Sequence, residues 1–492
     1  MTNTDRGVSE VSEAVRPQAA SVGGTCAGKR ALGRNRLPVG ALIAAVVGSG
    51  VLAMMWPYQP SDDALVYDRL AHNLMAGHGF SVSAAPPFTP TMQREPAYPL
   101  FLSGVFLIAG PGYGAVQLVQ MAFFVLTVLL IYRIAQRVAD ERTAQLAAWG
   151  TALAPPLVNY PTYLLSETLF TVLLVGLVWA LMETVSRAHL RWFMLAGVLW
   201  GLTVLCKAIM APFGLLIGAV WMAASRRGVS PSGRSLVVGA LVFLLSASCL
   251  VAPWVVRNYR RFGVASITSL RGSKAIWERS RKLSYNTQAI THQAVYGLSE
   301  YLGHRFYPEA AAQARDVLLR ESAMANQRQA ELAAAGYSEA AIDHTMLAEA
   351  LEPIRHHPLR YVAQSTLEAI KLTAVLYVPL LNEPMVEARF RQLPSGDILL
   401  SVLRGGFRLL AFALLVLALI GACAVSPIWP RWLLVFLPIV FLNVAYALTV
   451  GLGRYAVPLL PYYCLLGAVG WQCLRTRQVA AVVTSSPTGR VR

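Results

Sequence analysis

Long apolar runs constrain this chain more than any other feature of its sequence. Runs of about 20 residues, the length that crosses a bilayer as a helix, recur from residue 38 to residue 474. Only 14% of the residues are charged, whereas a soluble domain has about one quarter. Because lipid cannot hydrogen-bond the backbone, each run must satisfy its own polar groups as a helix. The sequence therefore predicts an all-α polytopic membrane protein.

The formal net charge of +17 has two interpretations. On a soluble protein it would suggest nucleic-acid binding. Here most arginines lie in short loops beside apolar runs, which is the pattern that orients helices with their basic loops in the cytoplasm. We therefore predict a bilayer and no nucleic acid as the partner of these charges, with some cations facing anionic lipid headgroups or phosphate.

Hydropathy and charge together divide the chain into five segments. They are a disordered cytoplasmic tail (1–37), a transmembrane module (38–256) that includes the first external loop (57–113), an external helical loop (257–403), the last transmembrane helices (404–474) and a second cytoplasmic tail (475–492). Interfacial helices are predicted within the first external loop, and amphipathic soluble helices over residues 309–356.

The stretch 361–381 leaves the topology open, because it is apolar but contains Glu368 and Lys371. If it spans the membrane, the basic tail beginning at Arg475 lies outside; if it is interfacial, that tail lies inside, as the positive-inside rule favours. We take it as interfacial, which predicts about ten spans within a range of 10–12. The protein is then expected in the plasma or inner membrane with a cytoplasmic N-terminus.

Polar residues from distant parts of the chain sort onto the predicted outer side, close to the bilayer. They include Asp62, Asp63, Arg94, Glu95, Glu167, Lys207, Arg257, Asn258 and Arg454. Charges near hydrocarbon are costly and generally have a partner or a function. A carboxylate can deprotonate an acceptor hydroxyl or amine, and cations can stabilise a departing phosphate. The set suits a reaction between an anionic lipid and a neutral acceptor.

Each of these residues also has a purely structural interpretation. Asp62 and Asp63 can cap a helix, Glu167 can favour a helix N-terminus, and Lys207 can extend to the interface. Arg94 and Glu95 can pair with each other, while Arg257 and Arg454 stand at span ends, where arginines are common. The six cysteines form no CxxC motif and the histidines show no metal-ligand spacing, so no cofactor is predicted, although a divalent ion stays open.

Five segments carry a resemblance to a known superfamily. They are SDDALVYDRLAHNLMAGHGF, REPAYPLF, YPTYLLSETLF, PWVVRNYRRFG and GRYAVPLLPYYCLLGAVG. In this order and spacing they resemble the GT-C superfamily of membrane glycosyltransferases, in the branch of the protein O-mannosyltransferases and the lipid A aminoarabinose transferases. The resemblance covers residues 38–475 apart from the helices at 309–350. It implies an inverting transferase that takes a sugar from a polyprenyl phosphate at the outer membrane face and passes it to a glycan, lipid or protein.

The resemblance also assigns roles to residues. Asp63 precedes Tyr67 by four positions, as in the D-x-x-x-Y pattern of the superfamily, and is expected to be the base, with Asp62 in reserve. Glu95 matches a second acidic position. Expected at the substrates are Arg94, Glu167, Tyr67, Lys207, Arg257, Asn258 and Arg454. The aminoarabinose transferases have an acid, a lysine and a proline pair where this chain has Arg94-Glu95-Pro96, which argues against that sugar.

A transporter or flippase of a lipid-linked saccharide is the alternative from another class. It would need charges at mid-span or broken helices along a path. The strong break, at 206–212, lies near the outer face, and no internal repeat is visible. A non-catalytic scaffold would leave the acids on one side without a function.

Overall fold

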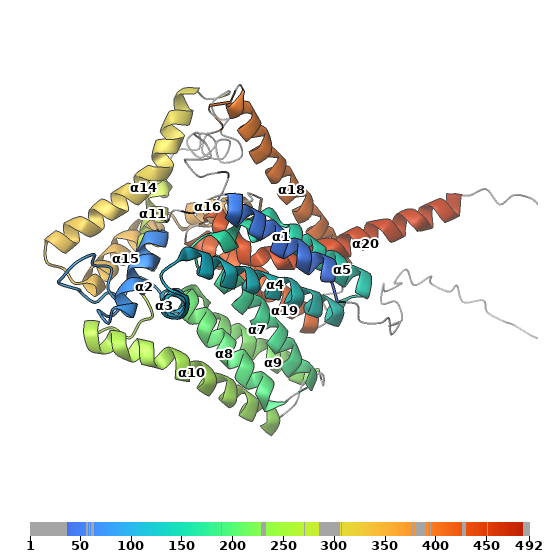
Figure 1. Cartoon of the computed structure of the whole chain (residues 1–492), viewed down its shortest axis with the longest axis horizontal. Helices are drawn as coiled ribbons and strands as arrows, with labels where there is room; N and C mark the ends of the chain where they lie inside the picture. Colours follow the sequence, from blue (N-terminus) through green and yellow to red (C-terminus); the bar gives the residue numbers. More distant parts are fainter. Residues whose placement is uncertain are drawn as a thin grey trace, which may run out of the picture. The chain divides into compact units, whose positions relative to one another are not determined.

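Helices form along the apolar runs and along the amphipathic stretch (Figure 1). The structure, a computed structural model, describes residues 37–55, 58, 60, 63–187, 189–227, 233–269, 271–284, 306, 308–374, 378, 381, 390, 392–393, 395–425, 430–449 and 451–485. Within this part the predicted all-α class is confirmed. The predicted tail 1–37 lies outside it except for Leu37, and Asp62 lies outside it as well.

The first half of the chain folds into ten α-helices within the described residues. They are α1 (Val39–Met55), α2 (Asp63–Met75), α3 (Ala97–Ala109), α4 (Tyr113–Val138), α5 (Glu141–Leu153), α6 (Pro155–Asn159), α7 (Glu167–Arg187), α8 (Leu190–Cys206), α9 (Phe213–Arg226) and α10 (Arg234–Phe262). The short 3₁₀ turns η1 (Tyr160–Thr162) and η2 (Ala208–Met210) join some of them.

The second half continues with helices of both kinds, soluble and apolar. They are α11 (Arg271–Arg281), α14 (Pro308–Ala334), α15 (Glu339–His356), α16 (Pro358–Ala374), α18 (Gly396–Ala424), α19 (Pro430–Leu448) and α20 (Leu460–Ser485), with the 3₁₀ turns η3 (Lys282–Ser284) and η5 (Gly453–Leu459). Helices α14 and α15 occupy the stretch in which soluble helices were expected. That this stretch lies outside the membrane stays a prediction.

Seven described helical segments are long and apolar enough to cross a membrane. They are Tyr113–Val138, Glu167–Arg187, Ala208–Arg226, Arg234–Phe262, Ile398–Ala424, Arg431–Leu448 and Gly453–Thr476. Helices α1, α3 and α8 are apolar but shorter. The predicted number of about ten spans therefore stays a prediction.

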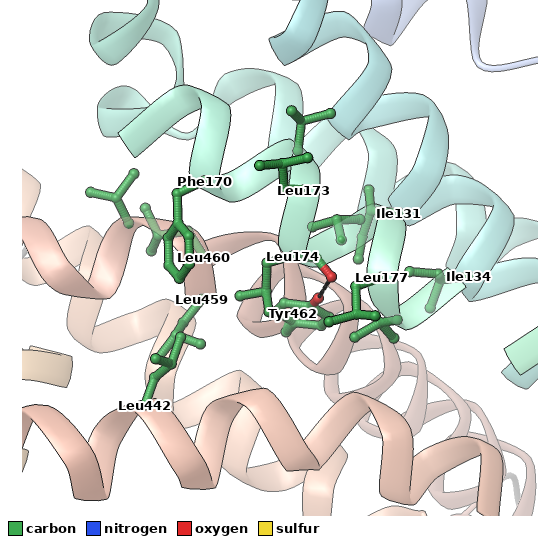
Figure 2. Packing of buried hydrophobic residues seen from close by; sticks show 14 of the residues in the cluster. Ile131, Ile134, Phe170, Leu173, Leu174, Leu177, Leu442, Leu459, Leu460 and Tyr462 are labelled. Carbon is green, nitrogen blue, oxygen red and sulfur yellow. Dashed lines mark hydrogen bonds between the residues drawn. The ribbon is translucent and has the colours of Figure 1, made fainter. Parts of the chain in front are cut away.

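Helix α7 lies at the centre of the core, and most of its side chains are buried. Figure 2 shows Phe170, Leu174 and their neighbours on α7 beside apolar side chains of α4, α19 and α20. The Tyr462 hydroxyl of α20 donates a hydrogen bond of 3.2 Å to the Leu174 carbonyl. Because α7 begins at Glu167 and η5 leads directly into α20, this packing brings Glu167 and the η5 turn to the same end of the helices.

Small residues permit the closest helix crossings, as is usual in membrane bundles. A Cβ on Gly197 of α8 would overlap the Phe243 carbonyl of α10. Gly421 of α18 and Gly470 of α20 face each other's backbone in the same way. At these glycines the backbones of α8 and α10, and those of α18 and α20, are in direct contact.

Arginines gather at one end of the membrane helices. At one end α4, α7 and α9 finish and α10 starts, with Arg137, Arg187, Arg226 and Arg234. There the buried Glu183 pairs with both Arg137 and Arg187. At the opposite end α7 and η5 start and α8 stops, and this end carries the candidate site.

Candidate active site

Asp63, the first residue of α2, lies between two arginines. Its Oδ1 atom is 2.7 Å from Nη2 of Arg94, and its Oδ2 atom is 2.7 Å from Nη2 of Arg454. The Asp63 side chain keeps 18% of its surface exposed. Charge-assisted bonds of this length are among the strong hydrogen bonds of proteins. One carboxylate thus joins the first loop to a turn 391 positions later in the chain.

A second group of charges lies deeper. Glu95, Glu167 and Lys207 are buried, and Nζ of Lys207 lies 3.6 Å from Oε1 of Glu167. Oε1 of Glu95 accepts a hydrogen bond of 3.4 Å from the backbone N–H of Ala208. Within the described residues, the buried Oε2 of Glu167 has no hydrogen-bond partner.

The ring of Tyr455 connects the two groups. It lies 5.6 Å from Nζ of Lys207 and 5.4 Å from Cζ of Arg454, both within the range of cation–π attraction. We call the six charged residues the charged cluster; they are Asp63, Arg94, Glu95, Glu167, Lys207 and Arg454. It contains three acids and three bases, so its formal charge is zero.

Breaks in regular helices place these groups. Helix α8 stops at Cys206, and Lys207 adopts an extended conformation with φ −145° and ψ 103°. Because the helix is broken here, the backbone N–H of Ala208 donates to Glu95. Glu95 itself precedes Pro96, which lacks an N–H and stands at the start of α3. The predicted break at 206–212 is therefore confirmed, and it forms one wall of the cluster.

Arg257 and Asn258, also expected at the substrates, lie among other contacts in the described structure. Nη1 of Arg257 donates to the carbonyl of Thr91 and to Oδ1 of Asn258, at 2.8 Å each. Its guanidinium faces the rings of three aromatic residues, Phe80, Trp254 and Phe262. Arg257 therefore anchors the first loop to the end of α10, while Asn258 accepts from Arg257 and donates to the Ser266 and Ile267 carbonyls after that helix.

Tyr67 is buried in the core, with its ring 5.0 Å from that of Tyr98 in an edge-on arrangement. The hydroxyl of Tyr98 in turn donates to Gln120 of α4. These contacts fix the orientation of α2, the helix that begins with Asp63. The role expected for Tyr67 at the substrate stays a prediction.

Two residues of this region were missed from the sequence. Tyr455 lies in a segment already noted, GRYAVP, but an interfacial tyrosine carries no signal of its own. Glu339 binds the first loop from α15, and nothing in its local pattern predicts this beyond a helix start after Ser338. Among the described residues, no group of three or more His, Cys, Asp or Glu side chains is placed to hold a metal ion.

Comparison with known proteins identifies a related family over part of the chain. Residues 90–254 match the family described as dolichyl-phosphate-mannose-protein mannosyltransferase. This stretch is about a third of the chain and includes Arg94, Glu95, Glu167 and Lys207. No curated protein matches the sequence.

Solved structures resemble the chain over most of its length. The oligosaccharyltransferase AglB from Archaeoglobus fulgidus, tethered to an acceptor peptide, aligns with a TM-score of 0.52 at 15% identity, over 91% of this chain and 51% of that one. AglB in complex with an inhibitory peptide and a dolichol-phosphate aligns with a TM-score of 0.50 at 14% identity, over 92% of this chain and 52% of that one. ArnT from Cupriavidus metallidurans, bound to undecaprenyl phosphate, aligns with a TM-score of 0.39 at 13% identity, over 92% of this chain and 81% of that one.

These comparisons define the class of the fold. The chain has the GT-C fold of membrane glycosyltransferases, and the resemblance seen in its sequence is confirmed. It spans about half the length of the oligosaccharyltransferase.

Proposed function

We propose that this protein is an integral membrane glycosyltransferase, which moves a sugar from a polyprenyl phosphate to an extracytoplasmic acceptor with inversion. The observation that carries the proposal is the Asp63 carboxylate held between Arg94 and Arg454, beside the buried Glu95, Glu167 and Lys207. An acid next to several cations at one end of a membrane bundle suits transfer from an anionic lipid. The family match and the GT-C fold support the same class.

The reaction is a single displacement at the anomeric carbon. A hydroxyl or amine of the acceptor attacks this carbon from the face opposite the phosphate, and the bond from carbon to phosphate oxygen breaks. The bonding electron pair leaves with the polyprenyl phosphate, and the acceptor proton passes to a carboxylate. One displacement inverts the configuration of the carbon.

Asp63 is the proposed base, although both its oxygens are paired in the structure. A phosphate is a better partner for two guanidiniums than a single carboxylate, because it offers more acceptor oxygens. We infer that the donor phosphate takes Arg94 and Arg454 away from Asp63 on binding. Asp63 then becomes free to accept the proton, so donor binding itself activates the base.

The other members of the charged cluster orient the substrates. Lys207 neutralises charge that develops on the phosphate. Glu95 and Glu167 accept hydrogen bonds from sugar or acceptor hydroxyls, and Oε2 of Glu167 has no hydrogen-bond partner among the described residues. Arg257 acts indirectly by holding the loop that carries Arg94, and Asn258 supports Arg257 through a hydrogen bond.

Charge supports the proposed side of the membrane, and the fold neighbour supports the proposed donor. The end opposite the cluster carries Arg137, Arg187, Arg226 and Arg234, and the positive-inside rule favours a cytoplasmic side for it. The cluster then faces the periplasm or cell exterior. AglB has been solved with a dolichol-phosphate, which supports a polyprenyl phosphate as the donor here.

Two measurements test the proposal. Purified full-length protein in lipid vesicles is given labelled polyprenyl-phosphate sugars and an envelope extract, and transfer of label is measured. In parallel, the envelope glycans and lipids of a deletion strain are compared with the parent by mass spectrometry. We expect one missing sugar and restored transfer of that sugar in vitro. Translocation of the lipid-linked sugar without product would instead establish the transporter alternative.

A further inference from the structure

Glu339, at the start of α15, holds the segment that leads into Arg94. Its Oε1 accepts from the Thr91 hydroxyl at 2.8 Å and from the Gln93 amide at 3.1 Å, and its Oε2 accepts from the backbone N–H of Met92 at 3.1 Å. The Ser269 hydroxyl is 3.5 Å from the same Oε2. A carboxylate with this many donors fixes the position of the loop immediately before two members of the charged cluster.

Glu368, on α16, packs against the turn that leads into Arg454. A Cβ on Gly451 would lie 2.6 Å from Oε2 of Glu368, so the carboxylate rests on the backbone of this glycine. The hydroxyl of Tyr361, on the same face of α16 and about two turns earlier, donates to the carbonyl of Leu448. The second arginine of the Asp63 pair is therefore positioned from α16.

Helix α11 connects these two holding points. The Trp277 indole N–H of α11 donates to Glu349 of α15 at 2.9 Å. On the other side, Nη1 of the buried Arg279 is 3.3 Å from Oε1 of Glu368, and its Nη2 donates to the Ser365 hydroxyl of α16 at 3.4 Å. A continuous set of contacts thus runs from the Arg94 loop through α15, α11 and α16 to the Arg454 turn.

We propose that α11, α15 and α16 form a brace that sets the separation of Arg94 and Arg454, with Glu339 and Arg279 as positioning residues. The link from the brace to donor binding rests on the proposed function. Two guanidiniums held at a fixed separation lose less freedom when they take up a phosphate, so the brace preorganises the site. Loosening either end should loosen both arginines, because the contacts through α15, α11 and α16 connect the two ends.

Hydrogen exchange of the full-length protein in lipid nanodiscs tests the brace without relying on activity. The variants are Glu339→Gln, which removes the charge that holds the loop, and Arg279→Lys, which keeps the charge but loses the two-point contact with α16. Glu352→Gln is the matched control, because Glu352 lies on α15 with its side chain 74% exposed. Exchange is followed at residues 91–95 and at residues 451–456.

We expect each variant to speed exchange at both segments and to weaken binding of sugar-free polyprenyl phosphate roughly tenfold, as for two coupled sites. The control should change neither, and the melting temperature should stay within the range of the control. If Glu339→Gln affects only 91–95, and Arg279→Lys only 451–456, the brace is refuted. If the wild type does not bind polyprenyl phosphate while both segments respond together, the brace stands and the proposed donor is wrong.

Discussion

At the scale of single residues, the site is defined by a carboxylate that is already neutralised. Asp63 has a guanidinium on each oxygen, and removing one partner of a largely desolvated ion pair leaves an uncompensated charge. In the proposed reaction, the donor phosphate provides a replacement partner, so the arginines leave Asp63 without becoming unpaired. The substitutions at Asp63 and at its arginines should therefore have opposite effects on donor binding.

Asp63→Asn should lower sugar transfer by at least about 100-fold, the scale of a lost general base. Binding of polyprenyl phosphate should be retained or strengthened, because the arginines lose their competing carboxylate. Transfer and lipid binding are measured on the same purified protein. Asp68→Asn, on the same helix but in contact with His72, is the control and should transfer normally. Undiminished transfer by Asp63→Asn would remove it from the chemistry.

Arg454→Lys keeps the positive charge but loses the planar fork that can bind two oxygens at once. We expect polyprenyl phosphate to bind about tenfold more weakly, in line with the loss of one hydrogen bond to a charged group. Arg94→Lys should behave alike, since both arginines hold Asp63 at the same distance. Arg261→Lys, which lies at the exposed end of α10, serves as the control. Equal binding by all three variants would contradict a phosphate site at Asp63.

At the scale of helices, local hydropathy predicts where elements lie more reliably than where they end. The helices expected within the first external loop (57–113) are α2, Asp63–Met75, and α3, Ala97–Ala109. The stretch expected at 361–381 begins earlier and is helical as Pro358–Ala374. Helix ends depend on caps and neighbours as well as hydropathy, whereas a break such as the one at Lys207 is signalled by Pro212.

Gly197→Ala should destabilise the crossing of α8 and α10, because its methyl group would overlap the Phe243 carbonyl. Overpacking of this kind costs about 1–3 kcal/mol. Gly218→Ala in α9 is the matched control, because a Cβ there meets nothing within 4 Å. It should be neutral or stabilising by about 0.5–1 kcal/mol, the helix propensity gain. Thermal unfolding in detergent measures both, and equal stability of the two variants would argue against the crossing.

Glu349→Gln should weaken the packing of α11, α14 and α15 in a pH-dependent way. Hydrogen bonding from Arg328 holds the pKa of Glu349 below its ordinary value. The stabilisation that ionised Glu349 gives to the folded state is therefore present above the ordinary glutamate pKa. It is lost as the pH falls through the lower pKa of the folded state. At pH 7 we expect a loss of about 1 kcal/mol or less, as for partly exposed ion pairs.

Hydrogen exchange of residues 339–356 measures this loss of stability. The difference between Glu349→Gln and the wild type should shrink as the medium becomes acidic. Glu331→Gln is the control, because Glu331 contacts the same Arg328 with half its side chain exposed, and its effect should be smaller. A difference that is constant with pH would contradict the assigned cause.

At the scale of the whole molecule, the site requires that both its halves face the same side of the membrane. A cysteine variant tests this directly in a background without native cysteines. Glu352→Cys should react with a membrane-impermeant maleimide added to intact cells, and Arg226→Cys should react only after the cells are opened. Both positions are exposed in the structure. Labelling of Arg226→Cys from outside would reverse the proposed orientation.

The sequence by itself determined the helical membrane class, the positions of most helices and the sorting of charged residues to one end. These properties depend on hydropathy and charge along short stretches, so they can be followed without a partner segment. The resemblance to the GT-C superfamily likewise depends on short segments in a fixed order.

Only the tertiary structure decided which charges meet. Asp63, at the start of α2, meets Arg454 of η5 from 391 positions away, and Arg257 donates to the Thr91 carbonyl. Glu339 reaches the first loop from the amphipathic helices, whose own pattern contains no sign of that contact. Pairing between distant side chains depends on how whole helices pack, and this packing is a sum over many residues that no short stretch of sequence contains.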